Sequence, residues 1–168
     1  DDRYQSYQLP FDFTFFGQTG RGVTLSTNGA IHFGFPQGVD INVLEYLSAR
    51  PMIAGLWDDL RTDRRPDDDI YVVSDPTKII FRWQAVTFDS PTGPGTTRGE
   101  NPVNFEIELD RDGAIKIRYG DGNHNVLPVV GASGGEPDSY VVDSHTSELA
   151  LRDLTLAPTV VFTRRRPI

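Results

Sequence analysis

The stretch Val103-Asn104-Phe105-Glu106-Ile107-Glu108-Leu109-Asp110 alternates apolar and polar residues without a break. Successive side chains of a β-strand point to opposite faces, so this pattern predicts a strand with one face toward a core and one outward. The following residues, Arg111-Asp112-Gly113, are typical of a turn, and residues 114–119 read as the returning partner strand. This part of the chain therefore predicts an antiparallel sheet.

The N-terminal part of the chain shows the same alternation. Residues 9–17 place Phe11, Phe13 and Phe15 on one face of a strand that ends at Gly17. Residues 23–26 and 30–34 read as two more strands, joined by a turn that contains Asn28-Gly29. Asn-Gly is the strongest short hairpin signal, because both residues tolerate a positive φ.

The remaining segments add further strands and one short helix. Residues 41–50 predict a short helix that Pro51 stops, and the apolar run Met52–Trp57 predicts a buried strand. Residues 58–69 form a charged loop, and residues 89–102 read as a long surface loop. Other strands are predicted over residues 70–73, 78–88, 129–132, 140–142 and 160–163. About ten strands in one domain predict a two-sheet antiparallel β-sandwich of jelly-roll type with at most one short helix. We expect a single domain over residues 1–168, with its core at about 9–163, excised from a larger protein.

Composition excludes several classes of function. The 168 residues carry a formal net charge of −8 and no cysteine. Zero cysteine excludes disulfides, zinc–thiolate sites, iron–sulfur clusters and thiol catalysis. The acidic balance argues against a nucleic-acid partner, and no apolar run approaches the ~18 residues of a membrane span. The lack of cysteine does not place the chain in the cytoplasm, because a core of this size holds without disulfides.

The order of short motifs resembles the nidogen-type extracellular domain, the NIDO domain. The likeness begins with Leu9-Pro10-Phe11, Phe15-Phe16-Gly17, Val23, Ser26-Thr27-Asn28-Gly29 and Phe33-Gly34. It continues with Ile53-Ala54, Trp57-Asp58-Asp59, residues 79–83, residues 104–109, Asp112-Gly113, Ile117, Tyr119-Gly120 and Val130-Gly131, and so spans about residues 9–163. The resemblance implies an extracellular or cell-surface module of matrix and adhesive proteins, with no catalytic motif to carry over. Many animal members sit beside cysteine-rich domains, so the lack of cysteine favours a bacterial version.

The charged loop holds the candidate metal ligands. Asp58, Asp59, Asp67, Asp68 and Asp69 could supply the carboxylate oxygens that calcium prefers. Arg61, Arg64 and Arg65 interleave with them and can neutralise the same acids. Asp58 could equally hydrogen-bond a turn after Trp57. We expect no required cofactor, with calcium as the one cofactor that the sequence admits.

Other polar groups have a structural and a catalytic interpretation. Glu106 and Glu108 lie about 7 Å apart on one strand face, a spacing that suits a pair of glycosidase carboxylates. Their outward strand face carries Asn104 and no aromatic residue, so a solvated strand face is favoured. Residues 121–125 begin like a calcium loop but lack its later glycine and acid, which favours a polar turn. His32 is expected on the surface, and Trp57 and Trp83 are expected in the core rather than stacked on sugars.

These observations favour a non-catalytic extracellular module for adhesion or interaction, located outside the cell or on its surface. Its partner would be a protein or glycan on a surface or in a matrix, recognised through the loops at 58–69 and 89–102. A calcium-stabilised carbohydrate-binding module is the first alternative, and a jelly-roll glycoside hydrolase is the second.

Overall fold

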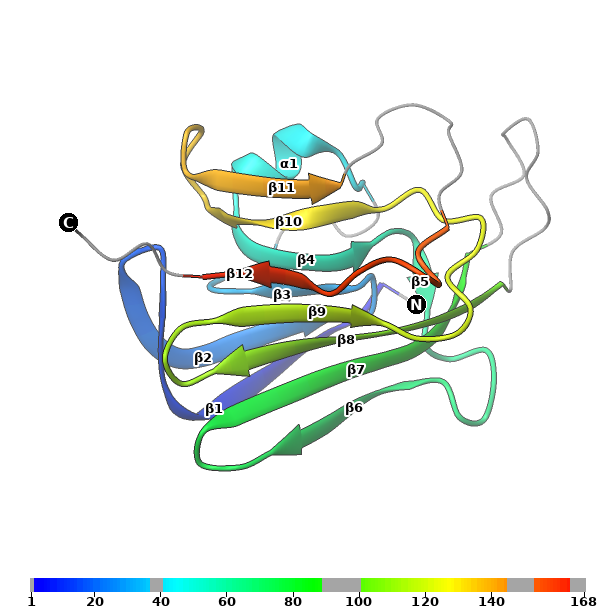
Figure 1. Ribbon diagram of the computed structural model, residues 1–168, viewed down its shortest axis with the longest axis horizontal. Coiled ribbons are helices and arrows are strands. Elements are labelled where there is room, and N and C mark those ends of the chain that lie inside the picture. The colour runs from blue at the N-terminus through cyan, green and yellow to red at the C-terminus, as the bar shows by residue number, and fades with distance from the viewer. Residues whose placement is uncertain (1, 37–40, 89–100, 145–152, 164–168) are drawn as a thin grey trace.

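Two antiparallel sheets of six strands each face one another in the computed structural model, which describes residues 2–36, 41–88, 101–144 and 153–163 (Figure 1). The first sheet has the strand order β1-β2-β3-β4-β10-β11, and the second has the order β12-β9-β8-β7-β5, with β6 also paired to β7. The elements are β1 Tyr4–Phe15, β2 Gln18–Ser26, β3 Ala30–His32, α1 Leu44–Ser48, β4 Pro51–Trp57, β5 Leu60–Arg61, β6 Asp69–Ser74, β7 Lys78–Thr87, β8 Pro102–Asp110, β9 Ile115–Tyr119, β10 Val129–Gly134, β11 Tyr140–Ser144 and β12 Val160–Phe162. The predicted two-sheet β-sandwich with one short helix is confirmed.

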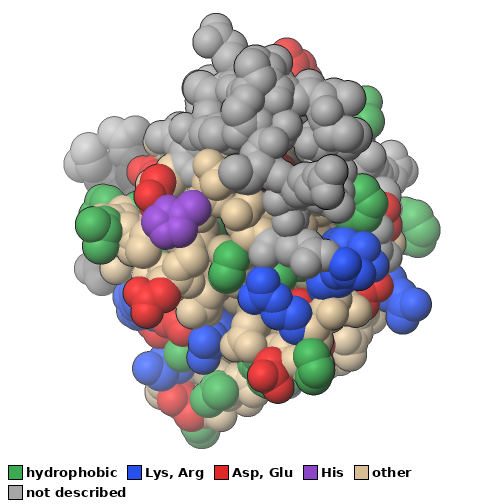
Figure 2. Space-filling model, turned by 90° about the vertical axis from the view of Figure 1, so that its right-hand side faces the viewer, with side chains coloured by type: hydrophobic (Ala, Val, Ile, Leu, Met, Phe, Trp, Pro, Cys, Tyr) green, Lys and Arg blue, Asp and Glu red, His purple; other side chains and the backbone are tan. Residues whose placement is uncertain are grey.

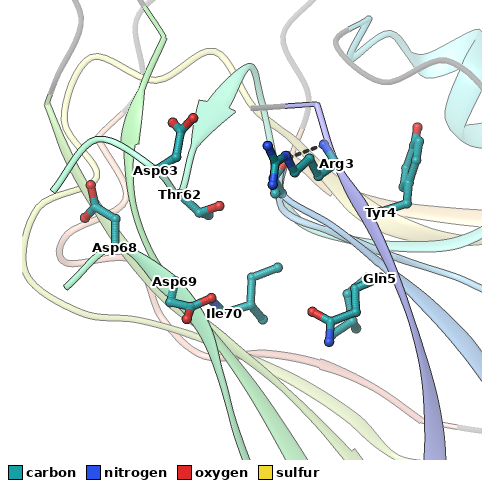
Figure 3. A pocket seen from close by; sticks show the side chains of 10 residues that line it. Arg3, Tyr4, Gln5, Thr62, Asp63, Asp68, Asp69 and Ile70 are labelled. Carbon is teal, nitrogen blue, oxygen red and sulfur yellow. Dashed lines mark hydrogen bonds between the residues drawn. The ribbon is translucent and has the colours of Figure 1, made fainter. Parts of the chain in front are cut away.

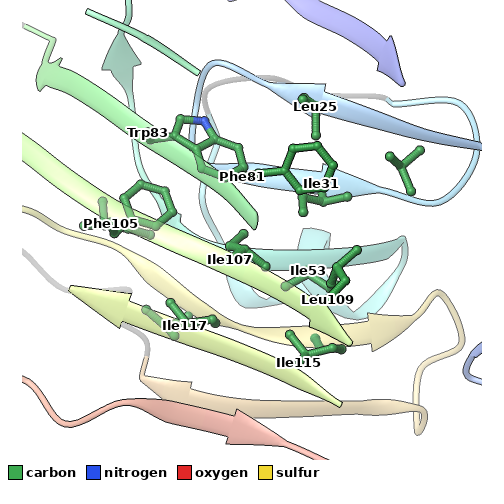
Figure 4. Packing of buried hydrophobic residues seen from close by; sticks show 14 of the residues in the cluster. Leu25, Ile31, Ile53, Phe81, Trp83, Phe105, Ile107, Leu109, Ile115 and Ile117 are labelled. Carbon is green, nitrogen blue, oxygen red and sulfur yellow. The ribbon is translucent and has the colours of Figure 1, made fainter. Parts of the chain in front are cut away.

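Strand β8 occupies the middle of the second sheet, between β7 and β9. Its alternation is confirmed, since Val103, Phe105, Ile107 and Leu109 are all buried. The rings of Phe105 and Trp83 stack in parallel with centroids 5.0 Å apart. Around this pair, buried aliphatic side chains from both sheets fill the space between the layers (Figure 4). The alternating pattern therefore predicts the inward face of β8 correctly.

Strand β4 is buried on both of its faces. Ile53 and Leu56 belong to the main core between the sheets, whereas Met52 and Trp57 pack in a second cluster with Leu47 of α1. The helix is shorter than the predicted span of 41–50, and it lies against β4 and β10 on the outer side of the first sheet (Figure 1). This second layer explains why the strand has an uninterrupted apolar sequence.

The sandwich has two structurally different ends. We call the right-hand end of Figure 1 the junction end; it holds the turn at 27–29, Asp58 and the connection between β5 and β6. We call the left-hand end the groove end; it holds the turns at 16–17, 111–113 and 135–139. The long strands keep the two ends apart, so a functional group at one end does not meet those at the other.

Some local predictions need correction. The first strand starts at Tyr4, five residues before the predicted start, and β5 lies inside the segment predicted as a charged loop. Most of the predicted surface loop, residues 89–100, lies outside the described residues. Among the described residues no helix is long and apolar enough to cross a membrane.

Candidate functional site

Asp58 is a largely buried carboxylate that joins two segments at the junction end. Its oxygens accept hydrogen bonds from the backbone N–H groups of Leu127, at 2.7 Å, and Asp59, at 2.9 Å. The amide of Asn42 lies 3.4 Å from the same carboxylate. Burial raises the pKa of Asp58 to about 6, although the two backbone hydrogen bonds oppose that rise. Of its two predicted roles, this geometry matches the hydrogen-bonded turn after Trp57.

The other candidate calcium ligands are dispersed along the loop. Asp68 accepts a hydrogen bond from the backbone N–H of Arg65 at 2.8 Å, and Asp69 accepts one from Ile70 at 2.7 Å. The backbone carbonyl of Asp67, rather than its carboxylate, accepts the hydroxyl of Tyr71. Within the described part of the chain, no three acidic or histidine side chains come together to hold a metal. Calcium binding at Asp58, Asp59, Asp67, Asp68 and Asp69 stays a prediction.

A hollow of about 440 Å³ separates this loop from the start of β1. Asp63, Asp68 and Asp69 lie on its loop side, and Arg3, which directly precedes β1, lies on the other side (Figure 3). Asp63 accepts a hydrogen bond from Arg61 at 3.0 Å, and this bond lowers the pKa of Asp63. Figure 2 shows this end of the molecule, where acidic and basic side chains are interspersed. The hollow is therefore polar, with both signs of charge around it.

The glutamates of β8 are held by cations on the outer face of the second sheet. Lys116 reaches Glu108 at 2.7 Å and Asp110 at 2.6 Å, while Arg118 reaches Glu106 at 2.7 Å and Glu108 at 3.1 Å. Glu108 is only 3% exposed, so the expected solvated face is in fact covered at this residue. Burial alone would raise the pKa of Glu108, but hydrogen bonds from Lys116 and Arg118 bring it below the ordinary value. A glycosidase acid needs a raised pKa, and Glu108 has the opposite shift.

A histidine, an aspartate and a threonine also meet at the junction end. His124 Nδ1 lies 2.6 Å from Asp153, and His124 Nε2 lies 3.3 Å from the hydroxyl of Thr155. That hydroxyl donates to the carbonyl of Gly122, and the imidazole is more than half exposed. The contacts from Thr155 to His124 to Asp153 resemble the nucleophile, base and acid of a catalytic triad. The Thr155 hydroxyl, however, is directed to a backbone carbonyl, and water reaches the His124 ring. These contacts match the polar turn that the sequence predicts at residues 121–125.

Asn28 and His32 are buried polar residues whose environment the sequence did not predict. Asn28 is fully buried at the junction end; its oxygen accepts the N–H of Leu60 at 3.0 Å, and its amide donates to Asp2 at 2.9 Å. His32, predicted on the surface, is buried with its ring edge-on to Tyr4, and burial lowers its pKa to about 4. The pattern Asn28-Gly29 is the signal that could have pointed to a special turn, but it does not reveal that the amide is inside.

The indole of Trp83 completes the junction between the sheets. Its Nε1–H donates to the carbonyl of Ser26 at 2.9 Å, so a core residue of the second sheet holds the turn of the first. Trp57 and Trp83 are both buried, which confirms their predicted place in the core. The motif at residues 26–29 therefore helps to hold the two sheets together.

The groove end carries an apolar groove of about 840 Å³ between the edges of the two sheets. Sequence reasoning missed it, because its walls come from five separate segments. They are Thr14, Phe15, Phe16, Gly17, Gly113, Ile115, Ala132, Asp138, Ser139, Tyr140, Val141, Val161, Phe162 and Thr163. Phe16, Tyr140, Val141 and Val161 are exposed to solvent there.

Comparison with known proteins gives one family match. A family model described as NIDO related matches residues 1–165, a range that includes every strand of both sheets. Neither curated proteins nor solved structures give a match to the chain.

Proposed function

The chain belongs to the NIDO-related family, and from this premise we propose that it is a non-catalytic extracellular module that binds a protein or glycan on a surface or in a matrix. The observation that carries the proposal is the extent of the match, because residues 1–165 contain the whole sandwich. A family match that covers the whole sandwich, together with a resemblance that implies no catalytic motif, supports a unit of recognition within a larger protein. Adhesion is the finer role that we propose for it.

The state of the carboxylates supports a role without catalysis. Glu106 and Glu108 are engaged by Arg118 and Lys116, and Asp58 is engaged by backbone N–H groups. Hydrolysis of a glycoside needs one carboxyl group that keeps its proton and another that meets the sugar from the opposite side. The exposed edges of the groove, by contrast, offer a surface for binding.

Binding and hydrolysis can be tested on the same samples. We expect the intact chain to bind at least one component when presented with immobilised matrix proteins and a glycan array. Soluble glycans incubated with it should release no new reducing ends. Glu106→Gln serves as a matched variant, which should bind as well as the native chain. New reducing ends that are lost in Glu106→Gln would replace this proposal with the hydrolase, and no binding to any component would remove it.

Calcium is a second proposal, made from the sequence. Asp68 and Asp69, two of the predicted ligands, line the hollow at the junction end together with Asp63, and carboxylate oxygens are the ligands that calcium prefers. Among the described residues these side chains do not converge into a group of three, so calcium binding would have to draw them together. A ligand that binds only the folded state raises the melting temperature, so calcium should raise it and EDTA should reverse the effect. Magnesium at the same concentration is the control. An unchanged melting temperature with calcium would reject a tight site.

A further inference from the structure

The groove lies where the second sheet stops short of the first. Val141 pairs in register with Ala132, whose side chain is buried, so Val141 points toward the same interior face. Nevertheless Val141 is 43% exposed, because nothing among the described residues covers it from the second sheet. Strand β12 is the edge of that sheet and pairs only with β9 within the described chain. One more strand beside β12 would cover Val141.

Phe16 combines a strained backbone with an exposed aromatic side chain. Phe16 has a φ of 45° and is 45% exposed, in a two-residue turn between paired Phe15 and Gln18. A left-handed backbone costs a residue with a side chain roughly 1–2 kcal/mol, and turns of this kind favour Asn-Gly. An exposed aromatic side chain held at that cost on the rim of a groove points to a role in recognition.

The one acidic side chain in the described groove lining indicates the charge expected of a partner. Asp138 is the one charged residue among the described residues that line it. Asp138 is exposed and forms no ion pair with a described residue. A partner that lies in the groove is therefore expected to be apolar along its length, with a positive charge where it passes Asp138.

We propose that the groove end binds an extended apolar segment of a partner polypeptide, which adds a strand beside β12 and places a basic residue against Asp138. The edge of β12 supplies main-chain hydrogen bonds, while Val141 and Phe16 receive alternate apolar side chains. A groove of about 840 Å³ falls within the range of roughly 300–1,000 Å³ that buries a ligand well. This inference rests on the proposed function and names the partner class for it.

A peptide fits these features better than the other occupants do. The groove lining includes polar side chains that a glycan could use, but its exposed aliphatic residues Val141 and Val161 suit the alternating apolar side chains of a peptide better than the hydroxyl groups of a sugar. A second copy of this chain would bring net charge −8 to a groove whose described lining has only a negative residue. Charge complementarity thus favours a basic partner over self-association.

The test begins with random twelve-residue peptides displayed on phage and selected on the intact chain. We expect the selected sequences to alternate apolar residues and to carry a Lys or Arg at one end. The synthetic form of the best peptide should then protect the amides of Val160–Phe162 from hydrogen exchange. Enrichment of sequences without these two features, or no enrichment, would overturn the proposal.

Matched variants locate the binding on the molecule. Val141→Glu should weaken the peptide at least about tenfold, since a carboxylate would be buried without a partner. Val73→Glu is the control, because Val73 is 68% exposed on β6, which belongs to the second sheet and does not line the groove. Both sites are exposed, so both variants should fold, and equal melting temperatures verify it. Equal affinity of the two variants for the peptide would overturn the proposal.

A charge reversal tests the contact with Asp138, and a measurement of mass tests whether a second copy of the chain occupies the groove. Asp138→Lys should favour the same peptide with Glu in place of its basic residue, and an unchanged preference would contradict the contact. Sedimentation should show a monomer; a dimer that Val141→Glu dissociates would assign the groove to a second copy and overturn the proposal. If the chain binds a glycan or matrix protein equally well with Val141→Glu, the proposed function stands and this inference alone fails.

Discussion

The two ends of the sandwich use similar turns for different purposes. At the junction end, the turn between β2 and β3 contains Thr27, Asn28 and Gly29, and only Gly29 has a positive φ, of 81°. At the groove end, the turn between β1 and β2 contains Phe16 and Gly17, and both have a positive φ. A β-carbon added to Gly29 would lie 2.0 Å from the carbonyl oxygen of Leu56, whereas one added to Gly17 would meet nothing within 4 Å.

Under the proposed function, this difference separates stability at the junction end from recognition at the groove end. The junction end joins the two sheets through Asn28, Trp83 and the close approach at Gly29. The groove end leaves Phe16 and Val141 uncovered. A module that binds through one end needs the other end to hold its two sheets together. Substitutions at the junction end should therefore lower stability, whereas substitutions at the groove end should weaken binding with little change in stability.

The largest effect is expected at the two glycines. Gly29→Ala combines the cost of a positive φ with displacement of a backbone carbonyl in β4, and should lower the free energy of unfolding by about 3–5 kcal/mol. Gly17→Ala has only the first cost, about 1 kcal/mol. Urea denaturation of both variants measures the difference. Similar losses in the two variants would mean that the close approach at Gly29 does not hold the sheets together.

Asn28→Ala should rank second. Its removal leaves the buried N–H of Leu60 without an acceptor and opens a small cavity, for a loss of about 2–4 kcal/mol in the free energy of unfolding. Asn101→Ala is the matched control, because Asn101 is only partly buried and donates weakly to Thr87 at 3.5 Å. If the two variants unfold at the same urea concentration, Asn28 is not a support of the junction.

A pH-dependent effect at Asp58 is expected to be smaller. Its folded pKa of about 6 lies above the ordinary value of 3.8, so the folded state binds a proton between these values that the unfolded state releases. Stability from this group is present below about pH 4 and is lost as the pH rises to about 6, by about 2–3 kcal/mol. Asp58→Asn should remove this dependence, which urea denaturation across pH 4–7 would measure.

His32 changes stability in the opposite direction over the same range. Its folded pKa of about 4 lies below the ordinary 6.5, so the unfolded state binds the extra proton and stability rises with pH between these values. The two groups offset each other in the native chain. Asp58→Asn should therefore expose a rise in stability from pH 4 to 6.5, and a curve parallel to that of the native chain would contradict the buried state of Asp58.

Periodicity explains what could be predicted from the sequence. The alternation over residues 103–110 and the phenylalanines of β1 follow from the two-residue repeat of a strand, and both sets are buried as expected. The position of the Asn28-Gly29 turn is confirmed, but the expected reason for Asn28, a positive φ, is wrong. Asn28 has no positive φ, and its amide is buried. The hairpin turn between β1 and β2 does have two positive φ values, yet it contains Phe16, a residue with no turn preference.

Tertiary burial explains the rest. His32 alternates with apolar neighbours like a surface residue, yet Tyr4 and Met52 lie beside it on the outer face of the first sheet. The groove has no local signal at all, because residues as distant as Phe16, Tyr140 and Val161 meet only in the folded chain. The five aspartates looked like one site because they are close in sequence, but a loop can direct neighbouring side chains to different partners.

The smallest effect on stability is expected at Phe16, where the groove hypothesis is most sharply tested. Phe16→Asn gives the turn an Asn-Gly pair and relieves about 1 kcal/mol of backbone strain. It also loses the edge-on contact with Phe15, at 4.8 Å between centroids, which is worth a similar amount, about 0.5–1.5 kcal/mol. The free energy of unfolding should therefore change by less than about 1 kcal/mol, while the selected peptide binds several-fold more weakly. A large loss of stability would make Phe16 a structural residue like Asn28, and the distinction between the two ends would fail at its decisive position.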